Sequence, residues 1–496
     1  MAAAVMAMAG PLQAAERVVT GGIVRGVELA DGGTIFRGIP YAQPPVGELR
    51  WKPPAPVKPW QGVRQATISG PPCIQRSYEW NAIDAKNGRE DCLYLDVRSP
   101  PHVAMARLPV MVWIHGGANR AGSGSGFIDS AIADRGVVLV TLQHRLGIFG
   151  FMSLAALTAE SGRGASGNYG LMDQIAVLRW VKENIAQFGG DPNNVTLFGH
   201  SAGSQDVGLL MLSPLAQGLF QKAIMESGTT GFGLPPRSLA QNEKLGEELQ
   251  TLMGIPAGPA GLAALRAAPG EALLDATDKL HPPIEDDSFI WLQAVVDGWV
   301  IPDAPANLMT SMHSAVPLII GNSAQELTLH DGLKNVRHWV EVAYGELARE
   351  ALALYGLDGP GMPQEDPMLG DVAKQIATDT TFRCPASWVA DRVEAAGAPV
   401  WRYQLDVDKP GSKEEVHHGS ELSFVFDKQP VGVSPAQWPP LLAYWTNFAK
   451  TGDPNGEGLA IWPRYGTAAN FLEFTPEGPR AGAKLRGPFC RLLNNP

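Results

Sequence analysis

The chain has 496 residues, of which 45% are hydrophobic and 18% are charged. These proportions are ordinary for a globular protein and exclude disorder as the main state, while the length exceeds that of one simple hydrophobic core. Asp and Glu (50) outnumber Lys and Arg (39), and the resulting net charge of −11 argues against nucleic acid as a partner. No run approaches the roughly 18 consecutive apolar residues of a membrane span, so we expect no transmembrane helix.

Residues 1–15 differ in composition from the rest of the chain. They carry no charge and are rich in Ala and Met, like the apolar region of a secretory signal, although a basic start is missing and the cleavage context is weak. We interpret residues 1–15 as a signal-peptide remnant and residues 16–496 as a single enlarged domain of a secreted or periplasmic protein. The four cysteines form no C-x-x-C pair, which fits two disulfides in an oxidising compartment, with four buried thiols as the alternative.

Short β-prone segments at 18–26 and 34–39 open the chain and lead into a proline-rich loop at 40–54. Apolar, β-branched runs without strict alternation follow, and they predict strands that are buried on both faces. These runs lie at 93–97, 109–114, 137–143 and 195–198.

Helical patterns lie between the predicted strands. The clearest covers 171–188, where apolar residues recur at three- and four-residue spacing until Gly189 and Gly190 end the run. An alternation of strands and helices predicts an α/β fold with a mainly parallel sheet flanked by helices. The mostly helical segments 238–357 and 367–393 read as insertions packed over the edge of that sheet.

A G-x-S-x-G motif occupies residues 199–203, with Ser201 at its centre. It directly follows the predicted strand 195–198 and precedes the apolar stretch 207–212, which is the strand, turn and helix order of a nucleophile elbow. Glycines permit a sharp turn with little bulk near the serine oxygen, and the helix N-terminus directs N–H groups at the reaction centre. The motif predicts a serine hydrolase; the alternative is a glycine-rich turn without catalytic function.

A serine hydrolase also needs donors for the oxyanion of its tetrahedral intermediate. The sequence His-Gly-Gly-Ala at 115–118 follows a predicted buried strand, where an oxyanion loop belongs. We expect the backbone N–H groups of Gly117, Ala118 and Ala202 to be these donors. The spaced glycines at 122–126 could instead form a phosphate-binding loop, but no helical pattern begins there and no acidic ribose ligand is evident.

The base and acid of such an enzyme follow the serine in the order Ser, Asp/Glu, His. Glu326 comes after the strand-like run 316–320, and His418 comes shortly before the apolar run 424–426. We place both at the carboxyl ends of strands, the edge where parallel sheets position their chemistry. On spacing alone, Asp331 or His417 could serve equally.

An ordered series of further motifs covers nearly the whole chain. Through this series of motifs, the chain resembles the type-B carboxylesterase family, the α/β-hydrolases that include cholinesterases and bacterial p-nitrobenzyl esterases. The motifs are GIVRG (22–26), FRGIPYA (36–42), EDCLYL (90–95), GNYGLMDQ (167–174), FGGDP (188–192), YWTNFA (444–449) and GDPN (452–455).

The resemblance implies an α/β-hydrolase that cleaves small-molecule carboxylic esters through an acyl-enzyme intermediate, with neither metal nor organic cofactor. Ser201 would be the nucleophile, Glu326 the acid and His418 the base, because His-Gly-x-Glu is the pattern of the family. An amidase, lipase or carbamate hydrolase could use the same triad. The intact triad argues against a non-catalytic adhesion or binding member of the superfamily.

Family resemblance also bears on the cysteines and on residues around the site. It implies disulfides that join Cys73 to Cys92 and Cys384 to Cys490. Trp80 lies in the loop between the first pair, where family members line the gorge, so we expect it at the substrate site or in ordinary packing.

The chain departs from its relatives beside the nucleophile. His200 stands where relatives commonly carry Glu, and Asn119 and Arg120 stand where an aromatic residue often follows the oxyanion loop. We expect these three side chains at the substrate site, with His200 neutral and hydrogen-bonded rather than catalytic. Arg120 could meet an anionic group of the substrate through its fork of donors, or be paired within the protein.

Overall fold

The computed structural model describes residues 14–101, 107–231, 235–280, 294–330, 332–412, 415–434 and 437–493. Most of the predicted signal-peptide remnant lies outside these ranges. Its last two residues, Ala14 and Ala15, begin strand β1 (Ala14–Val19), which pairs antiparallel with β2 (Gly22–Glu28). Among the described helices, none is long and apolar enough to cross a membrane.

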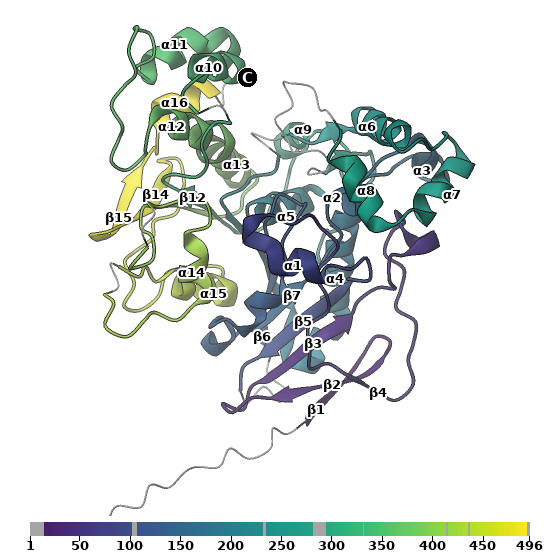
Figure 1. The fold of residues 1–496 in the computed structure, drawn as a ribbon. Helices are drawn as coiled ribbons and strands as arrows, with labels where there is room; N and C mark the ends of the chain where they lie inside the picture. The colour runs from purple at the N-terminus through teal and green to yellow at the C-terminus, as the bar shows by residue number, and fades with distance from the viewer. Residues whose placement is uncertain are drawn as a thin grey trace, which may run out of the picture.

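One 13-stranded sheet runs through the described part of the chain, in the order β1-β2-β3-β5-β7-β6-β8-β9-β12-β13-β14-β15, with β4 beside β2 (Figure 1). Its six central pairings, from β7-β6 to β13-β14, are parallel. The other pairings along this order are antiparallel, whereas β4 pairs parallel with β2. The remaining strands are β3 (Thr34–Pro40), β4 (Val63–Gln65), β5 (Tyr94–Ser99), β6 (Leu108–Ile114), β7 (Val138–Leu142), β8 (Gly190–His200), β9 (Lys222–Glu226), β12 (Leu318–Ser323), β13 (Val400–Leu405), β14 (Asn470–Thr475) and β15 (Gly478–Ala483), while β10 (Arg237–Ser238) and β11 (Val295–Val296) form a separate pair.

The central strands are buried on both faces, as their unbroken apolar runs predicted. In β6, Val110 and Val112 belong to one hydrophobic core, whereas Met111 and Trp113 between them belong to a second core across the sheet. Because successive side chains of a strand point to opposite faces, each core strand must be apolar at every position. The expected mainly parallel α/β architecture is confirmed.

Helices cover both faces of this sheet. The helix predicted at 171–188 is observed as α4 (Tyr169–Asn184) with a 3₁₀ turn to Phe188, and it ends at Gly189 in the left-handed conformation (φ 79°). Other helices in the first half are α1 (Ala82–Asn87), α2 (Gly147–Phe151), α3 (Ala155–Glu160) and α5 (Ala202–Leu212). In the last part of the chain they are α14 (Glu421–Phe426), α15 (Leu441–Thr451) and α16 (Gly487–Leu493).

Helices occupy much of both segments predicted as helical insertions, but the first segment also contains β12, a central strand of the sheet. In Figure 1, α6, α7 and α8 gather on one side of the molecule, and α10, α11 and α12 gather with α16 on the other. Their bounds are α6 (Leu239–Leu252), α7 (Pro259–Ala267), α8 (Gly270–Thr277), α9 (Pro305–Thr310), α10 (Val336–Tyr344), α11 (Ala348–Leu354), α12 (Val372–Thr378) and α13 (Cys384–Ala395).

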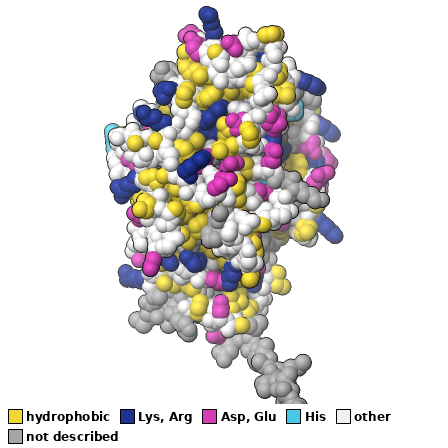
Figure 2. All heavy atoms as spheres, turned by 90° about the vertical axis from the view of Figure 1, so that its left-hand side faces the viewer, with side chains coloured by type: hydrophobic (Ala, Val, Ile, Leu, Met, Phe, Trp, Pro, Cys, Tyr) yellow, Lys and Arg dark blue, Asp and Glu magenta, His cyan; other side chains and the backbone are white. Residues whose placement is uncertain are grey.

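Two disulfides cross-link the chain, and both are the predicted ones: Cys73–Cys92 and Cys384–Cys490. The first closes the loop that carries α1, and the second ties α16 to the start of α13. On the face shown in Figure 2, basic and acidic side chains are interspersed among apolar ones. The charge of that face is therefore distributed rather than gathered by sign.

Candidate active site

Ser201 occupies the sharp turn between β8 and α5. Its backbone lies at φ 57° and ψ −123°, a conformation that residues other than glycine rarely adopt and that costs free energy on the order of 1–3 kcal/mol. Backbone bonds on both sides hold the turn, since the N–H of Ser201 donates to the Glu226 carbonyl (2.9 Å) and its carbonyl accepts from Gln205 (2.9 Å). The predicted strand, turn and helix geometry is thus present.

Close backbone approach explains the glycines around Ser201. A Cβ on Gly203 would lie 2.2 Å from the Ile114 carbonyl oxygen, and one on Gly199 would lie 2.6 Å from the Gly203 carbonyl. A Cβ on Gly116 would lie 3.1 Å from Ser201 Cβ. Only glycine therefore allows α5 to sit on the end of β6 with Gly116 packed against Ser201.

The loop predicted to bind the oxyanion, called the oxyanion loop below, is a tight turn closed by its own backbone. The N–H groups of Arg120 and Ala121 both donate to the Gly117 carbonyl at 3.0 Å, while Gly117, Ala118 and Asn119 all have positive φ (106°, 53° and 51°). Within the described residues, the N–H groups of Gly117 and Ala118 have no acceptor. Ala202 begins α5, so its N–H has no acceptor within the helix.

Glu326 and His418 meet although 92 residues separate them in the sequence: Glu326 Oε2 and His418 Nδ1 are 2.6 Å apart. Glu326 follows β12, and His418 lies in the loop between β13 and α14; the apolar run 424–426 belongs to that helix. Burial lowers the pKa of His418, but the charge and hydrogen bond of Glu326, with a contribution from Glu421, outweigh it and raise the pKa above its ordinary value. The carboxylate therefore stabilises an imidazolium at this position.

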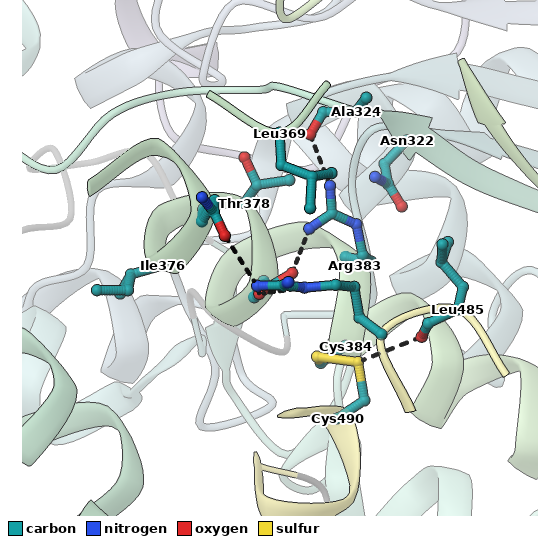
Figure 3. A network of polar contacts seen from close by, with 12 residues as sticks. Asn322, Ala324, Leu369, Ile376, Thr378, Arg383, Cys384, Leu485 and Cys490 are labelled. Atoms are coloured by element: carbon teal, nitrogen blue, oxygen red, sulfur yellow. Dashed lines mark hydrogen bonds and ion pairs between the residues drawn. A yellow bond between two sulfur atoms is a disulfide. The ribbon is translucent and has the colours of Figure 1, made fainter. Parts of the chain in front are cut away.

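The loop that carries Glu326 is hydrogen-bonded to residues of α12 and of the π-helical turn Asp379–Arg383. Figure 3 shows Arg383 and Thr378 beside Ala324 of this loop. The Arg383 guanidinium donates to the Ala324 carbonyl (2.6 Å) and is paired with Asp379. The Thr378 hydroxyl accepts from the Glu326 N–H at 3.1 Å, and Glu326 Oε1 accepts from the N–H of Ser323 at 2.7 Å. These bonds fix the carboxylate in the orientation that faces His418.

His200 packs directly against His418. The two imidazole rings lie 4.5 Å apart, and His200 Nε2 is 4.0 Å from Glu421 Oε1. Burial, together with the neighbouring His418, places the pKa of His200 well below its ordinary value, so this ring is neutral at neutral pH. The expected hydrogen bond at Nε2 is not observed, because the nearest acidic oxygen, on Glu421, is 4.0 Å away and the buried Nε2 has no hydrogen-bond partner among the described residues. Burial and the nearby Glu326 carboxylate raise the pKa of Glu421 to about 7.

Trp80, Tyr78 and Arg120 form an aromatic and cationic wall beside the oxyanion loop. Trp80 is 63% exposed and stacks on Tyr78 (6.1 Å), and the Arg120 guanidinium lies 4.5 Å from the Tyr78 ring centre. A Cβ on Gly117 would lie 3.1 Å from the Trp80 ring. Burial lowers the pKa of Arg120, whereas Tyr78 and an acidic neighbour raise it, and so strong a base remains charged at neutral pH.

The competing sequence interpretations find less support in the structure. The His417 side chain is 47% exposed and contacts Ser420 and Asp408 rather than the Glu326 carboxylate. Asp331 lies outside the described residues. In the glycine-rich segment 122–126, the N–H groups of Gly122 and Gly124 donate to the side chains of Gln75 and Gln143, so they are not available to a phosphate.

A sheet, elbow, oxyanion loop and histidine–glutamate pair in this arrangement define a serine hydrolase of the α/β-hydrolase class. The sequence model of the Carboxylesterase family matches residues 13–493, and the chain belongs to this family. The chain is 34% identical to carboxylesterase 4A of Bos taurus, over 94% of this chain and 92% of the relative. It is 32% identical to the fumonisin B1 esterase of Sphingopyxis macrogoltabida, over 91% of this chain and 85% of the relative.

A solved PNB esterase structure has a TM-score of 0.81 and 33% identity, covering 96% of this chain and 99% of that one. Together with the family membership, this similarity identifies the protein as a serine carboxylesterase. It hydrolyses small-molecule carboxylic esters through a Ser-His-Glu triad and an acyl-enzyme.

Several residues at the site were not predicted from the sequence. Glu421 stands three residues after His418, within the His-Gly-x-Glu pattern that identified the base. Asp206 is an acidic residue immediately before the apolar stretch of α5, and a charge beside a buried run was a usable signal. Thr378 and Phe382 left no such signal, because their role depends on where α12 packs; the Phe382 ring lies 5.3 Å from that of His418.

Proposed function

We propose that Ser201 is the nucleophile of this carboxylesterase, His418 its base and Glu326 its acid. We further propose that the N–H groups of Gly117, Ala118 and Ala202 bind the oxyanion. The observation that carries the assignment is the 2.6 Å contact between Glu326 and His418. The His418 ring packs on His200, which directly precedes Ser201, so the proposed base and nucleophile lie close together at the same edge of the sheet.

The proposed reaction proceeds in two halves. His418 accepts the proton of Ser201, whose oxygen attacks the carbonyl carbon, and the three N–H groups stabilise the negative oxygen that forms. The tetrahedral intermediate collapses as the carbon–oxygen bond to the alcohol breaks, and His418 gives its proton to the leaving oxygen. Water, deprotonated by the same imidazole, then attacks the acyl-enzyme and releases the carboxylic acid. Glu326 orients the ring and stabilises its charged form throughout.

A fluorophosphonate probe and a steady-state assay test these roles. Ser201→Ala should abolish labelling and lower kcat by about 10⁴ or more without unfolding the protein. His418→Ala and Glu326→Gln should each be severely impaired. His417→Ala is the matched control, because His417 is adjacent in sequence but contacts Asp408 and Ser420 instead of Glu326, and it should keep most activity. Labelling of the Ser201→Ala variant, or reversed behaviour of the two histidine variants, would contradict the assignment.

For the substrate, we propose a preference for neutral or carboxylate-bearing esters over those of cationic alcohols. Support comes from the neutral His200 beside the base, where relatives commonly carry a carboxylate, and from the Arg120 cation in the wall beside the oxyanion loop. Trp80 would contribute an apolar surface at the rim, given its 63% exposure. Initial rates on esters matched in size and differing in charge test the preference, and faster turnover of choline esters would contradict it.

We propose export to an oxidising compartment, as a secreted or periplasmic protein. Two disulfides support this location, because such bonds persist outside the reducing cytosol. Peptide mapping under non-reducing conditions, on protein from fractionated cells, tests it. Four free thiols in the exported fraction would reject the proposal.

We also propose that residues 16–496 form a single folding unit, with helical insertions at approximately 238–357 and 367–393, the first of which is interrupted by the sheet strand β12. One continuous sheet runs from β1 to β15, which supports this division. A single cooperative unfolding transition, seen alike by calorimetry and by tryptophan fluorescence, is the expected result. Two separable transitions would show independent units.

A further inference from the structure

Asp206 is a buried carboxylate that the triad does not use. It lies in α5, five residues after Ser201, and is completely buried. Its Oδ1 accepts a hydrogen bond from Asn119 Nδ2 (2.9 Å), and its Oδ2 accepts one from Gln174 Nε2 (2.6 Å). Both partners are buried as well, at 1% and 0% exposure.

This arrangement links three elements around the nucleophile. Asn119 belongs to the oxyanion loop, Asp206 to the helix that begins at Ser201, and Gln174 to the neighbouring helix α4. Burying a carboxylate between two neutral amides costs free energy, and no cation among the described residues bonds to it to offset that cost. A purely structural contact between these elements could be made by apolar side chains.

The bond from Asn119 acts at the most constrained part of the loop. Ala118 and Asn119 both have positive φ, a conformation unfavourable for residues with a side chain. The Asn119 side chain is held by Asp206, and its carbonyl accepts from the N–H of Gly147 at 2.7 Å. Asn119 is thus held by its side chain and by its carbonyl, which restrains the residue directly after Ala118 and, through the Ala118 backbone, the peptide that carries the Ala118 N–H. The side chain expected to contact substrate is instead turned into the protein.

We propose that Asp206 is a positioning residue for ester hydrolysis, which holds the oxyanion loop in register with the nucleophile helix through Asn119. The donors on the loop and the donor on the helix then converge on one oxygen. This inference rests on the proposed assignment of Gly117, Ala118 and Ala202 as those donors. Sites of this kind must be held to about 0.5 Å, and a displacement of about 1 Å can cost up to 10²-fold in rate.

A positioning role predicts a specific kinetic signature. The loop donors act on the oxyanion, which exists in the transition state and not in the ground state, so their misalignment lowers kcat and leaves KM nearly unchanged. Asp206→Ala and Asn119→Ala should each lower kcat by about 10- to 100-fold. The double variant should be no worse than the poorer single variant, because both substitutions break the same bond.

The conservative variant Asp206→Asn separates position from charge. The carbonyl oxygen of the new Asn side chain can still accept from Asn119. Its NH₂ group can donate to Gln174 Oε1, which has no partner among the described residues of the wild type, once the Gln174 amide has flipped. This variant should keep kcat within about threefold of the wild type.

Inhibition by a trifluoromethyl ketone and by the methyl ketone of the same size provides the direct test. The fluorinated compound forms a hemiketal with the serine, whose negative oxygen fills the oxyanion hole, whereas the methyl ketone binds as a ground-state mimic. Asp206→Ala and Asn119→Ala should weaken the first by about 10-fold or more and leave the second unchanged. Asn242→Ala is the control, since Asn242 is an equally buried amide that donates to Phe151 and Ser153, away from the oxyanion loop.

Each outcome bears on the proposal. Unchanged discrimination between the two ketones in Asp206→Ala and Asn119→Ala overturns it, and so does an equal loss in Asn242→Ala, which would indicate general loosening. If Asp206→Ala fails to fold, Asn119→Ala and Asp206→Asn carry the test. A wild-type enzyme with no preference for the fluorinated ketone would contradict the assigned oxyanion donors, and therefore the proposed function itself.

Discussion

Replacing His200 by Glu is expected to move the acid limb of the pH–rate profile. The His200 and His418 rings are 4.5 Å apart, so a carboxylate in the place of the first ring would lie against the imidazolium that the second becomes. The attraction stabilises the protonated base and raises its pKa. In the proposed mechanism His418 acts as a neutral base, so the enzyme would then require a higher pH.

The size of the shift follows from the geometry. Two unit charges at the separation of the rings interact by about 4 kcal/mol at an effective dielectric constant of ~20, equivalent to between two and three pH units. The new carboxyl group would also be buried near Glu421, whose pKa is already raised to about 7, so part of it would be protonated. We therefore expect the midpoint of the acid limb to rise by about one unit, with the plateau of kcat/KM within a few-fold of the wild type.

The assay is kcat/KM for a neutral ester from pH 5 to pH 9, measured for His200→Glu and for the neutral control His200→Gln. Using an uncharged substrate removes direct attraction between substrate and the new charge. The glutamine variant should keep the midpoint of the wild type, because the native ring is itself neutral. An unmoved midpoint in His200→Glu, or an equal shift in both variants, would refute the electrostatic reasoning.

Three further outcomes are expected. Arg120→Ala should raise KM for carboxylate-bearing esters about threefold more than for neutral esters of equal size, and equal effects would mean that Arg120 is structural. Removing the Cys384–Cys490 disulfide with paired serine substitutions should destabilise the fold by up to about 4–5 kcal/mol, given the 106-residue separation; an unchanged melting temperature would contradict this. Burial raises the pKa of Asp206 to about 7, so the folded state retains a proton between pH ~4 and ~7 that the unfolded chain has lost, and stability falls as pH rises through that window. Asp206→Asn should remove this dependence, measured as a gain in melting temperature over the wild type that grows from pH 4 to pH 8.

The sequence by itself determined the local features of this protein. An unbroken apolar run such as that of β6 can only be a strand covered on both faces, and the glycines around Ser201 require a turn with close backbone approach. Family motifs along the whole chain gave the fold, the class of reaction and both disulfide pairings. These features depend on residues that are near one another in the chain or on the order of the motifs.

Tertiary structure decided how distant groups are oriented and which buried partners they take. On spacing, His417 and His418 were equivalent; the family pattern favoured His418, and the packing of the loop after β13 places this ring against Glu326. Asn119 was expected at the substrate, yet its amide turns inward because Asp206, which lies 87 residues away in the sequence, offers a buried carboxylate. A side chain of this kind takes the partner that lowers its desolvation cost, and no pattern along the chain specifies that partner before the elements have packed.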